Sequence, residues 1–319
     1  MPGKRLTAED TMAATIVPHL WFDKEAREAA AFYASVFPDS AVDHVTTLRN
    51  TPSGDCDVVS FHLAGQPFMA ISAGPLFKFN PSISFILNFD PSRDPDARKH
   101  LDATWKKLAA GGTPLMPLQE YPFSKRYGWI QDRYGLTWQL TLTNPNGDPR
   151  PFLMPSLMFT GNNAGRADEA IEHYLRAFPG SKRGNTTRYP KGMAPDKEGT
   201  LMFADFTLQG QWLAVMDSAH PHGFTFNEAV SLLVKCKDQK EIDAFWSKLS
   251  AVPEAEQCGW LKDKFGVVWQ IAPQEMDAML QNGTPEQVDR VTQAFLPMKK
   301  FDVEALRRAY EGGVAKTVR

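Results

Sequence analysis

The sequence predicts an α+β protein made of two tandem copies of one unit, with two βαβββ modules in each copy and helices at the C-terminus. The first observation is an internal repeat. The segment Gly128–Leu140, GWIQDRYGLTWQL, recurs as Gly259–Ile271, GWLKDKFGVVWQI. The second observation is that strand-like and helix-like apolar patterns alternate in the same order in both copies. With 319 residues, the chain is long enough for two ordinary domains.

Four further blocks repeat in the same order upstream of this segment, which indicates duplication rather than chance similarity. The copies are separated by Asn144–Pro151, whose Pro, Gly and Asn residues cannot continue a strand or helix. We therefore expect an N-terminal extension at 1–15, a first domain at 16–145, a second domain at 152–273 and a helical extension at 274–319. The matched blocks are Phe32–Ser40 with His173–Ser181, Phe61–Ser72 with Phe206–Asp217, Phe77–Ser84 with Phe224–Ser231, and Trp105–Leu108 with Trp246–Leu249.

Local patterns define the elements of the first module. Apolar residues between Lys24 and Phe37 keep helical spacing, and Asp23 before them is the expected N-cap. A turn at Ala64-Gly65 joins two strands in a hairpin. The predicted strands are Val17–Phe22, Ala41–Leu48, Val58–Leu63 and Pro67–Ser72.

The same pattern then restarts. Ile83–Asn88 is a predicted strand, and Asp94-Pro95 supplies an N-cap and a proline at the first position of the next helix. In copy two, Asp238 and Glu241 form a predicted capping box ahead of the corresponding helix. The βαβββ module is therefore expected four times.

The C-terminal extension is predicted to be helical. Thr284 and Gln287 form a capping box around a proline, and a second short helix follows Asp302 at Val303–Tyr310. Copy one has no counterpart of these helices. Because their apolar stripes need a partner, we expect them to cover an exposed sheet surface or a dimer seam.

The composition excludes several classes of protein. There are 35 Lys+Arg against 37 Asp+Glu, without a basic block, so nucleic acid and membrane surfaces are poor candidates for partners. Cys56, Cys236 and Cys258 lie far apart and form no CxxC pair, which favours a reducing cytoplasm. The N-terminus lacks the apolar segment of a signal peptide, and no apolar run has the length of a membrane span.

The chain resembles the PhnB-like (3-demethylubiquinone-9 3-methyltransferase-like) branch of the glyoxalase/bleomycin-resistance, or vicinal oxygen chelate, superfamily. The resemblance rests on PHLWF at the start of copy one, on the F-x-F-N…S blocks, and on QCGWLKDKFGVVWQI at the end of copy two. It implies tandem glyoxalase-like domains, in each of which two βαβββ modules form a cupped eight-stranded sheet around a small-molecule cleft. It also implies an internal pseudo-dimer, with a homodimer left open.

In catalytic members of the superfamily, the resemblance implies a divalent metal held by the first strand of each module and by a last strand. The matching residues of copy one are His19, Ser84 and Gln139, with Ser82 on the same strand face as the alternative to Ser84, so His19 and Gln139 are also the catalytic candidates. This set contains no carboxylate, and imidazole plus carboxylate is the combination that compensates a divalent charge. The sequence therefore predicts a degenerate metal site. The corresponding residues of copy two are Ser156, Ser231 and Gln270.

Further candidates line the implied clefts. Strand alternation places His19 and Trp21 on one face, and His19 is alternatively a hydrogen-bonded core histidine. The amide of Gln139 or Gln270 sits between apolar neighbours and needs a partner in a ligand or in the backbone. The predicted substrate-binding residues are Trp21, Asn80, Ser82, Asn227 and Gln270, with turn formation as the alternative for the two asparagines.

Two functions remain open at this stage. The preferred one is a small-molecule binding module, since both copies lack the acidic ligand. The alternative is a metal-dependent vicinal oxygen chelate enzyme of lyase, isomerase or dioxygenase type acting on a small oxygen-bearing substrate. The cofactor is unassigned, with a weakly bound divalent metal as the candidate and no nucleotide cofactor. A methyltransferase reaction finds no support, because the chain lacks the G-x-G-x-G turn of common S-adenosylmethionine enzymes.

Overall fold

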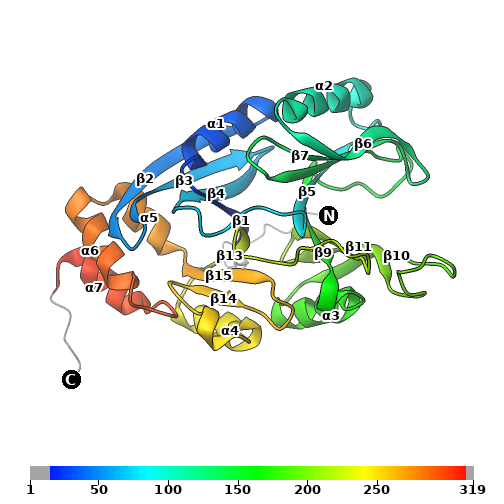
Figure 1. The fold of residues 1–319 in the computed structure, drawn as a ribbon. Helices are drawn as coiled ribbons and strands as arrows, with labels where there is room; N and C mark the ends of the chain where they lie inside the picture. The colour runs from blue at the N-terminus through cyan, green and yellow to red at the C-terminus, as the bar shows by residue number, and fades with distance from the viewer. Residues whose placement is uncertain (1–14, 314–319) are drawn as a thin grey trace, which may run out of the picture.

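The computed structural model describes residues 15–313, so the predicted N-terminal extension 1–15 lies outside it except for Thr15 (Figure 1). The strands are β1 (Thr15–Phe22), β2 (Ala41–Thr51), β3 (Gly54–Leu63), β4 (Gln66–Ser72), β5 (Ile83–Phe89), β6 (Thr113–Tyr121), β7 (Ser124–Gln131), β8 (Thr137–Leu142), β9 (Leu153–Phe159), β10 (Lys182–Arg188), β11 (Leu201–Leu208), β12 (Gln211–Asp217), β13 (Val230–Cys236), β14 (Trp260–Lys262) and β15 (Val268–Pro273). The α-helices are α1 (Ala26–Val36), α2 (Ala97–Ala109), α3 (Ala167–Ala177), α4 (Gln239–Leu249), α5 (Glu275–Asn282), α6 (Pro285–Phe295) and α7 (Val303–Glu311).

The α+β class and the tandem glyoxalase-like architecture are confirmed, but the modules pair differently from the expectation. Each sheet combines one module from each copy. Sheet A has the strand order β14-β15-β13-β1-β4-β3-β2, and sheet B the order β10-β11-β12-β9-β5-β8-β7-β6. The joints are the antiparallel pairs β1–β13 and β5–β9. The first strands of the four modules have similar apolar patterns. The sequence pattern alone therefore does not determine which two first strands pair with each other.

The hydrophobic core is continuous across both copies, but its two equivalent helix–strand aromatic pairs each lie within one copy. In copy one, Tyr33 of α1 packs on Trp138 of β8 with ring centroids 5.2 Å apart. In copy two, Tyr174 of α3 packs on Trp269 of β15 at 5.3 Å. Each such pair joins a helix on one sheet to a strand of the other. Figure 1 accordingly shows α1 and α2 above the sheets and α3 and α4 below them. The molecule is thus an internal pseudo-dimer in which the copies share both sheets.

The repeated D-x-x-G-x-x-W segment forms a hydrogen-bonded turn between two strands, as its Asp and Gly residues predicted. The buried Asp263 carboxylate accepts hydrogen bonds from the Phe265 and Val267 amides at 2.8 and 3.0 Å, and from the Trp269 indole at 2.9 Å. Gly266 in the same turn has φ +82°, a conformation that favours glycine. Asp132 holds the equivalent turn and Trp138 in copy one.

The sheets differ at one edge. In sheet B, β6 pairs with β7, whereas the corresponding segment of copy two forms a short 3₁₀ turn at Pro253–Ala255 and adds no strand. Sheet A therefore has seven strands. The C-terminal chain lies along the edge where this strand is missing. There the Cys258 and Gly259 amides donate to the Met298 and Lys299 carbonyls, both at 2.7 Å.

Several predicted details of the elements are confirmed. Asp238 caps α4 as predicted, although the Glu241 side chain accepts the Lys237 amide and does not complete the capping box. Thr284 and Gln287 form the capping box of α6, and the helix predicted after Asp302 is α7. Two predicted caps are wrong. The N-cap of α1 is Glu25 instead of Asp23, and α2 starts after Asp96, because Asp94 instead accepts the Asp96 amide in a local turn.

Helix α5 was not predicted, because its eight residues carry too short an apolar stripe for a clear helical period.

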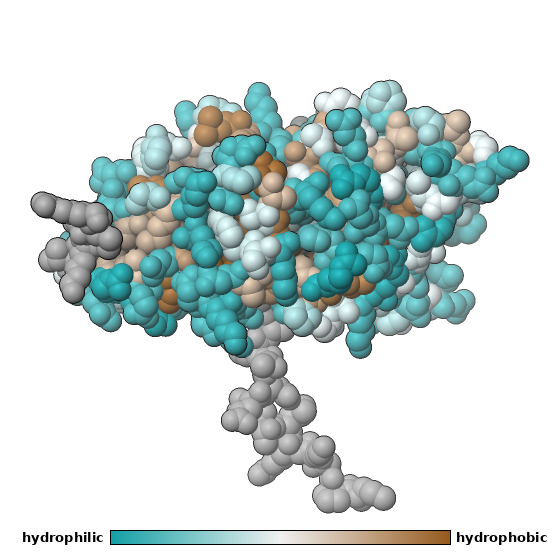
Figure 2. Space-filling model, turned by 90° about the horizontal axis from the view of Figure 1, so that it is seen from below, coloured by the Kyte–Doolittle hydropathy of each residue, from teal (hydrophilic) through white to brown (hydrophobic). Residues whose placement is uncertain are grey.

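Figure 2 shows the molecule from below, where hydrophilic residues cover most of the surface and hydrophobic ones are scattered. Within residues 15–313, no helix has both the length and the apolar character required to cross a bilayer.

Candidate functional site

The candidate site lies on the face of sheet A opposite α1 and α4, which we call cup A. Its centre is formed by the first strands of two modules, where His19 of β1 lies directly opposite Ser231 of β13. Gln270 of the neighbouring β15 donates through its side-chain nitrogen to the Ser231 hydroxyl at 2.8 Å. His19 and Gln270 are 5% and 9% exposed, and both line one cavity. The imidazole and the amide therefore face the same space.

Aromatic rings form one wall of this cavity. The His19 ring meets Trp260 edge to face at 5.5 Å, and Trp21 contacts Trp260 at 6.0 Å and Phe77 at 5.0 Å. The Trp21 indole donates to the Gly74 carbonyl at 2.8 Å, which fixes its orientation. A flat ligand would find preformed edge and face contacts here.

The cavity has a volume of about 530 Å³ and is roofed by the C-terminal segment 274–311, which we call the C-terminal cap. The roof side chains are Met276 and Leu280 of α5, Phe295 and Leu296 at the end of α6, and Phe301. The size and mostly apolar lining are typical of pockets for small organic molecules. The prediction that the C-terminal helices cover a sheet surface matches this packing.

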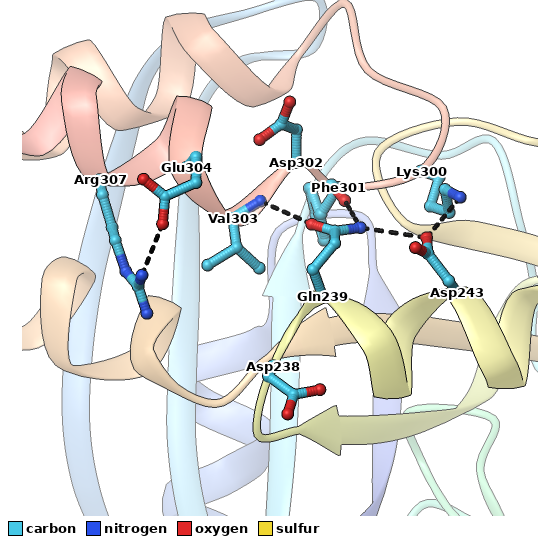
Figure 3. Close-up of a pocket in the computed structure, with 9 residues that line it drawn as sticks. All are labelled: Asp238, Gln239, Asp243, Lys300, Phe301, Asp302, Val303, Glu304 and Arg307. Carbon is cyan, nitrogen blue, oxygen red and sulfur yellow. Dashed lines mark hydrogen bonds and ion pairs between the residues drawn. The ribbon is translucent and has the colours of Figure 1, made fainter.

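The cap is fastened at both edges of sheet A. At the copy-one edge, the Thr46 hydroxyl of β2 donates to the Leu280 carbonyl at 3.2 Å. At the other edge, Gln239 of α4 donates to the Phe301 carbonyl at 3.0 Å and accepts the Val303 amide at 2.9 Å. Figure 3 shows this clasp, with the Gln239 side chain directed at the chain between α6 and α7. Hydrogen bonds therefore hold the cap over the cavity from two sides.

The shallow pocket shown in Figure 3 is a consequence of the clasp. It lies between the N-termini of α4 and α7, and its charged groups are satisfied within the protein. Lys300 pairs with Asp243, and Arg307 pairs with Glu304. We regard it as part of the cap attachment.

Charge is arranged asymmetrically around cup A. The residues that line the cavity include Glu228, Glu254 and Asp277 but neither lysine nor arginine. Glu228 pairs with Lys262 at 2.6 Å, and Asp277 pairs with Lys235 at 2.5 Å.

Burial away from any carboxylate partner lowers the pKa of His19 to about 3. The imidazole is consequently neutral over the physiological range, and its Nδ1 has no hydrogen-bond partner among the described residues.

On the corresponding face of sheet B, which we call cup B, the glutamine amide is paired at both ends within the protein. Gln139 donates to the Ser84 hydroxyl at 2.8 Å, as Gln270 does to Ser231, but here the Tyr127 hydroxyl also donates to the other end of the amide at 2.7 Å. Ser156 takes the place of His19. Near β11, Arg150 of the linker pairs with Asp205 at 2.7 Å.

The structure thus corrects the predicted grouping of His19, Ser84 and Gln139. His19 lies in cup A, while Ser84 and Gln139 lie in cup B, because β1 pairs with β13 of the other copy. The structure instead brings His19 together with Trp21 and Gln270. The sequence analysis did not identify Ser231 as the neighbour of His19. Pairing the first strands of modules from different copies would have placed these two residues together.

The other predicted binding residues lie elsewhere. The Asn80 side chain donates to the Thr225 carbonyl at 3.0 Å, and Asn227 donates to the Lys78 carbonyl at 2.8 Å, so the two asparagines clasp the copies together. Each also accepts a backbone amide two residues later, which is the turn-forming role weighed against ligand contact. Ser82 is buried ahead of β5, away from the residues that line the cup A cavity.

The donor atoms of cup A do not fit a divalent metal. Across the four strands at its centre stand the His19 imidazole, the Ser231 hydroxyl, the Gln270 amide and the Met69 thioether. None carries a negative charge, and His19 Nδ1 lacks the second partner that normally orients a ligand imidazole. Residues 15–313 contain no cluster of three His, Cys, Asp or Glu side chains suited to a metal ion.

The paired βαβββ modules define a protein of the glyoxalase-fold, or vicinal oxygen chelate, class. The sequence profile of the family described as 3-demethylubiquinone-9 3-methyltransferase matches residues 14–141 and 152–272. The chain therefore belongs to this PhnB-like family.

Some solved structures are also similar to the chain. The PhnB protein from Bacillus cereus is 36% identical over 40% of this chain and 98% of its own length, with a TM-score of 0.36. Glyoxalase I from Zea mays is 11% identical over 83% of this chain and 95% of its own, with a TM-score of 0.50, and shows the shared fold. No curated protein matches the chain.

Proposed function

We propose that this chain is a small-molecule binding protein whose ligand pocket is the capped cup A. The observation that carries the proposal is the cavity of about 530 Å³, lined by aromatic and aliphatic side chains and provided with two inward-facing polar groups, His19 and Gln270. Pockets that bind small organic molecules combine a large apolar surface with a few such polar groups. Cup B lacks the cap, and its amide is already paired with Tyr127.

The proposal requires no metal. A neutral imidazole, a hydroxyl, an amide and a thioether cannot compensate a divalent charge, so the donor set favours binding over metal-dependent lyase, isomerase or dioxygenase chemistry. The family description names a methyltransferase, but the chain lacks the glycine-rich turn of the common S-adenosylmethionine fold. We place the protein in the cytoplasm, which suits three cysteines that are all free thiols.

The test is a titration with the uncharged fluorescent probe N-phenylnaphthylamine, together with native mass spectrometry of freshly purified protein. We expect saturable binding of one probe per chain. Ile71→Trp should fill the cavity and abolish binding, because Ile71 lines it on β4. The matched control is Met216→Trp, at the equivalent position of β12 in sheet B, which should bind the probe normally. Equal loss in both variants, or no saturable binding by the native protein, would contradict the proposal.

A further inference from the structure

We infer that cup A selects uncharged ring compounds bearing a hydroxyl group and rejects carboxylates and other anions. The inference rests on the proposed binding function and specifies its ligand class. It depends on three independent features of the cavity: the pairing of its amide, the state of its imidazole, and the sign of the charges around it.

The amide pairing differs between the two cups at one position. In cup B, Tyr127 bonds to the Gln139 amide, which is thereby satisfied at both ends. The residue of copy two that matches Tyr127 is Cys258, whose thiol is directed instead at the Leu296 carbonyl of the cap, 3.4 Å away. No described residue takes the place of the tyrosine hydroxyl on Gln270. In cup B the phenolic hydroxyl of Tyr127 satisfies the oxygen end of the glutamine amide. In cup A the corresponding end of Gln270 is left for a ligand hydroxyl.

The second polar group of the cavity accepts the same kind of ligand. The neutral His19 ring offers one donor and one acceptor nitrogen, and its buried Nδ1 has no partner within residues 15–313. A hydroxyl group both donates and accepts, so it can pair with the imidazole and with either end of the Gln270 amide. The edge-to-face arrangement of His19 and Trp260 places this polar corner beside an aromatic wall that suits a ring.

The charges around the cavity exclude anions. A carboxylate ligand would be taken from water into an apolar space without a cation among the lining residues. The ammonium groups of Lys235 and Lys262, which contact residues that line the cavity, are already paired with Asp277 and Glu228. Glu254, at the exposed end of the cavity, adds a further negative charge. Electrostatics consequently oppose an anion on entry and in the bound state.

The experiment compares naphthalene, naphthol and naphthoate of the same ring substitution by calorimetric titration of the full-length protein near neutral pH. We expect naphthol to bind about tenfold or more tightly than naphthoate, which corresponds to about 1.4 kcal/mol or more. In Gln270→Met, which keeps the length of the side chain but removes the amide, naphthol should lose about threefold to tenfold in affinity. Naphthalene should be unaffected. Gln139→Met, in cup B, is the matched control and should change none of the three affinities.

The outcomes separate this inference from the proposed function. Naphthoate binding as tightly as naphthol, or an unchanged naphthol affinity in Gln270→Met, would overturn the ligand class and leave the pocket as a binding site. If none of the three compounds binds and N-phenylnaphthylamine also fails to bind, both the ligand class and the proposed function are overturned. Retention of binding by all compounds in Ile71→Trp would show that they occupy another site.

Discussion

The Cys258 backbone amide donates a hydrogen bond to the Met298 carbonyl at 2.7 Å, which joins the C-terminal cap to the edge of sheet A. In sheet B the residue equivalent to Cys258 is Tyr127, which pairs with Gln119 of β6. The C-terminal chain therefore stands where an outer strand would otherwise be. Cap and sheet edge are one hydrogen-bonded unit, so disturbing this edge should open the cavity.

Gly259 offers a direct test of this coupling. Its φ is +81°, and a Cβ at this position would lie 2.4 Å from the Phe301 ring of the cap. Gly259→Ala should therefore displace Phe301 and destabilise the protein by about 1–2 kcal/mol for the left-handed backbone conformation, plus a steric cost. We expect a lower midpoint of denaturant unfolding, a changed emission of the adjacent Trp260, and weaker probe binding.

Gly266→Ala is the matched control for this substitution. Gly266 has nearly the same φ, +82°, but open space around its missing Cβ. It should show the backbone cost alone and keep the probe affinity of the native protein. Equal effects of the two substitutions on probe affinity would contradict a cap that is held through Gly259.

The buried Asp263 supports a prediction about stability. Asp263→Asn leaves one acceptor oxygen where the carboxylate served two backbone amides, the Trp269 indole and the Tyr174 hydroxyl. A buried donor without a partner costs about 1–3 kcal/mol, and we expect a loss of this size in the free energy of unfolding. In a double-mutant cycle with Trp269→Phe, the two losses should be less than additive, because each removes the same hydrogen bond. Strict additivity would contradict this account.

How far the fold follows from the sequence depends on the distance over which each signal acts. The caps at Asp238 and Thr284 and the turns at Asp132 and Asp263 were predicted, because each involves residues within a few positions of one another. The pairing of β1 with β13 was not, because it joins segments more than two hundred residues apart whose apolar patterns are shared by the competing strands.

The same reason limits the prediction of the site. His19, Trp21 and Gln270 were identified individually, and all three line the cup A cavity. Their grouping failed because it assumed that each cup is built from one copy. The cap was expected to cover a surface, but the hydrogen bond from Thr46 to Leu280 joins residues 234 positions apart and has no local sequence signal.

The lack of a metal-binding set leads to a gain-of-function prediction. Ser231→His combined with Gln270→Glu would add an imidazole and a carboxylate beside His19, in the arrangement that the strand pairs already provide. We expect this variant to bind zinc or nickel and to be stabilised by it, with a concentration-dependent rise in Tm. Ser84→His with Gln139→Glu makes the same change in cup B, where Ser156 replaces His19, and should bind more weakly. A native protein that retains stoichiometric metal after treatment with a chelator would contradict the conclusion that the donor atoms of cup A do not suit a divalent metal.

The last prediction concerns the pH dependence of stability that His19 imposes. Burial lowers the pKa of this imidazole from 6.5 to about 3 in the folded protein. The unfolded chain therefore binds a proton that the folded chain excludes once the pH falls below about 6.5. Stability from this group is fully present above that value and is lost progressively as the pH falls toward the folded pKa, at up to about 1.4 kcal/mol per pH unit.

This loss can be measured against a variant without the imidazole. We expect the free energy of unfolding of the native protein, relative to that of His19→Gln, to fall by about 1.5 kcal/mol between about pH 6.5 and about pH 5. The affinity for an uncharged ligand should stay constant over the same range while the protein remains folded, because His19 stays neutral in the pocket. A difference from His19→Gln that is independent of pH, or an NMR titration of the His19 ring with a midpoint near 6.5, would show that the imidazole is hydrated rather than buried beneath the cap.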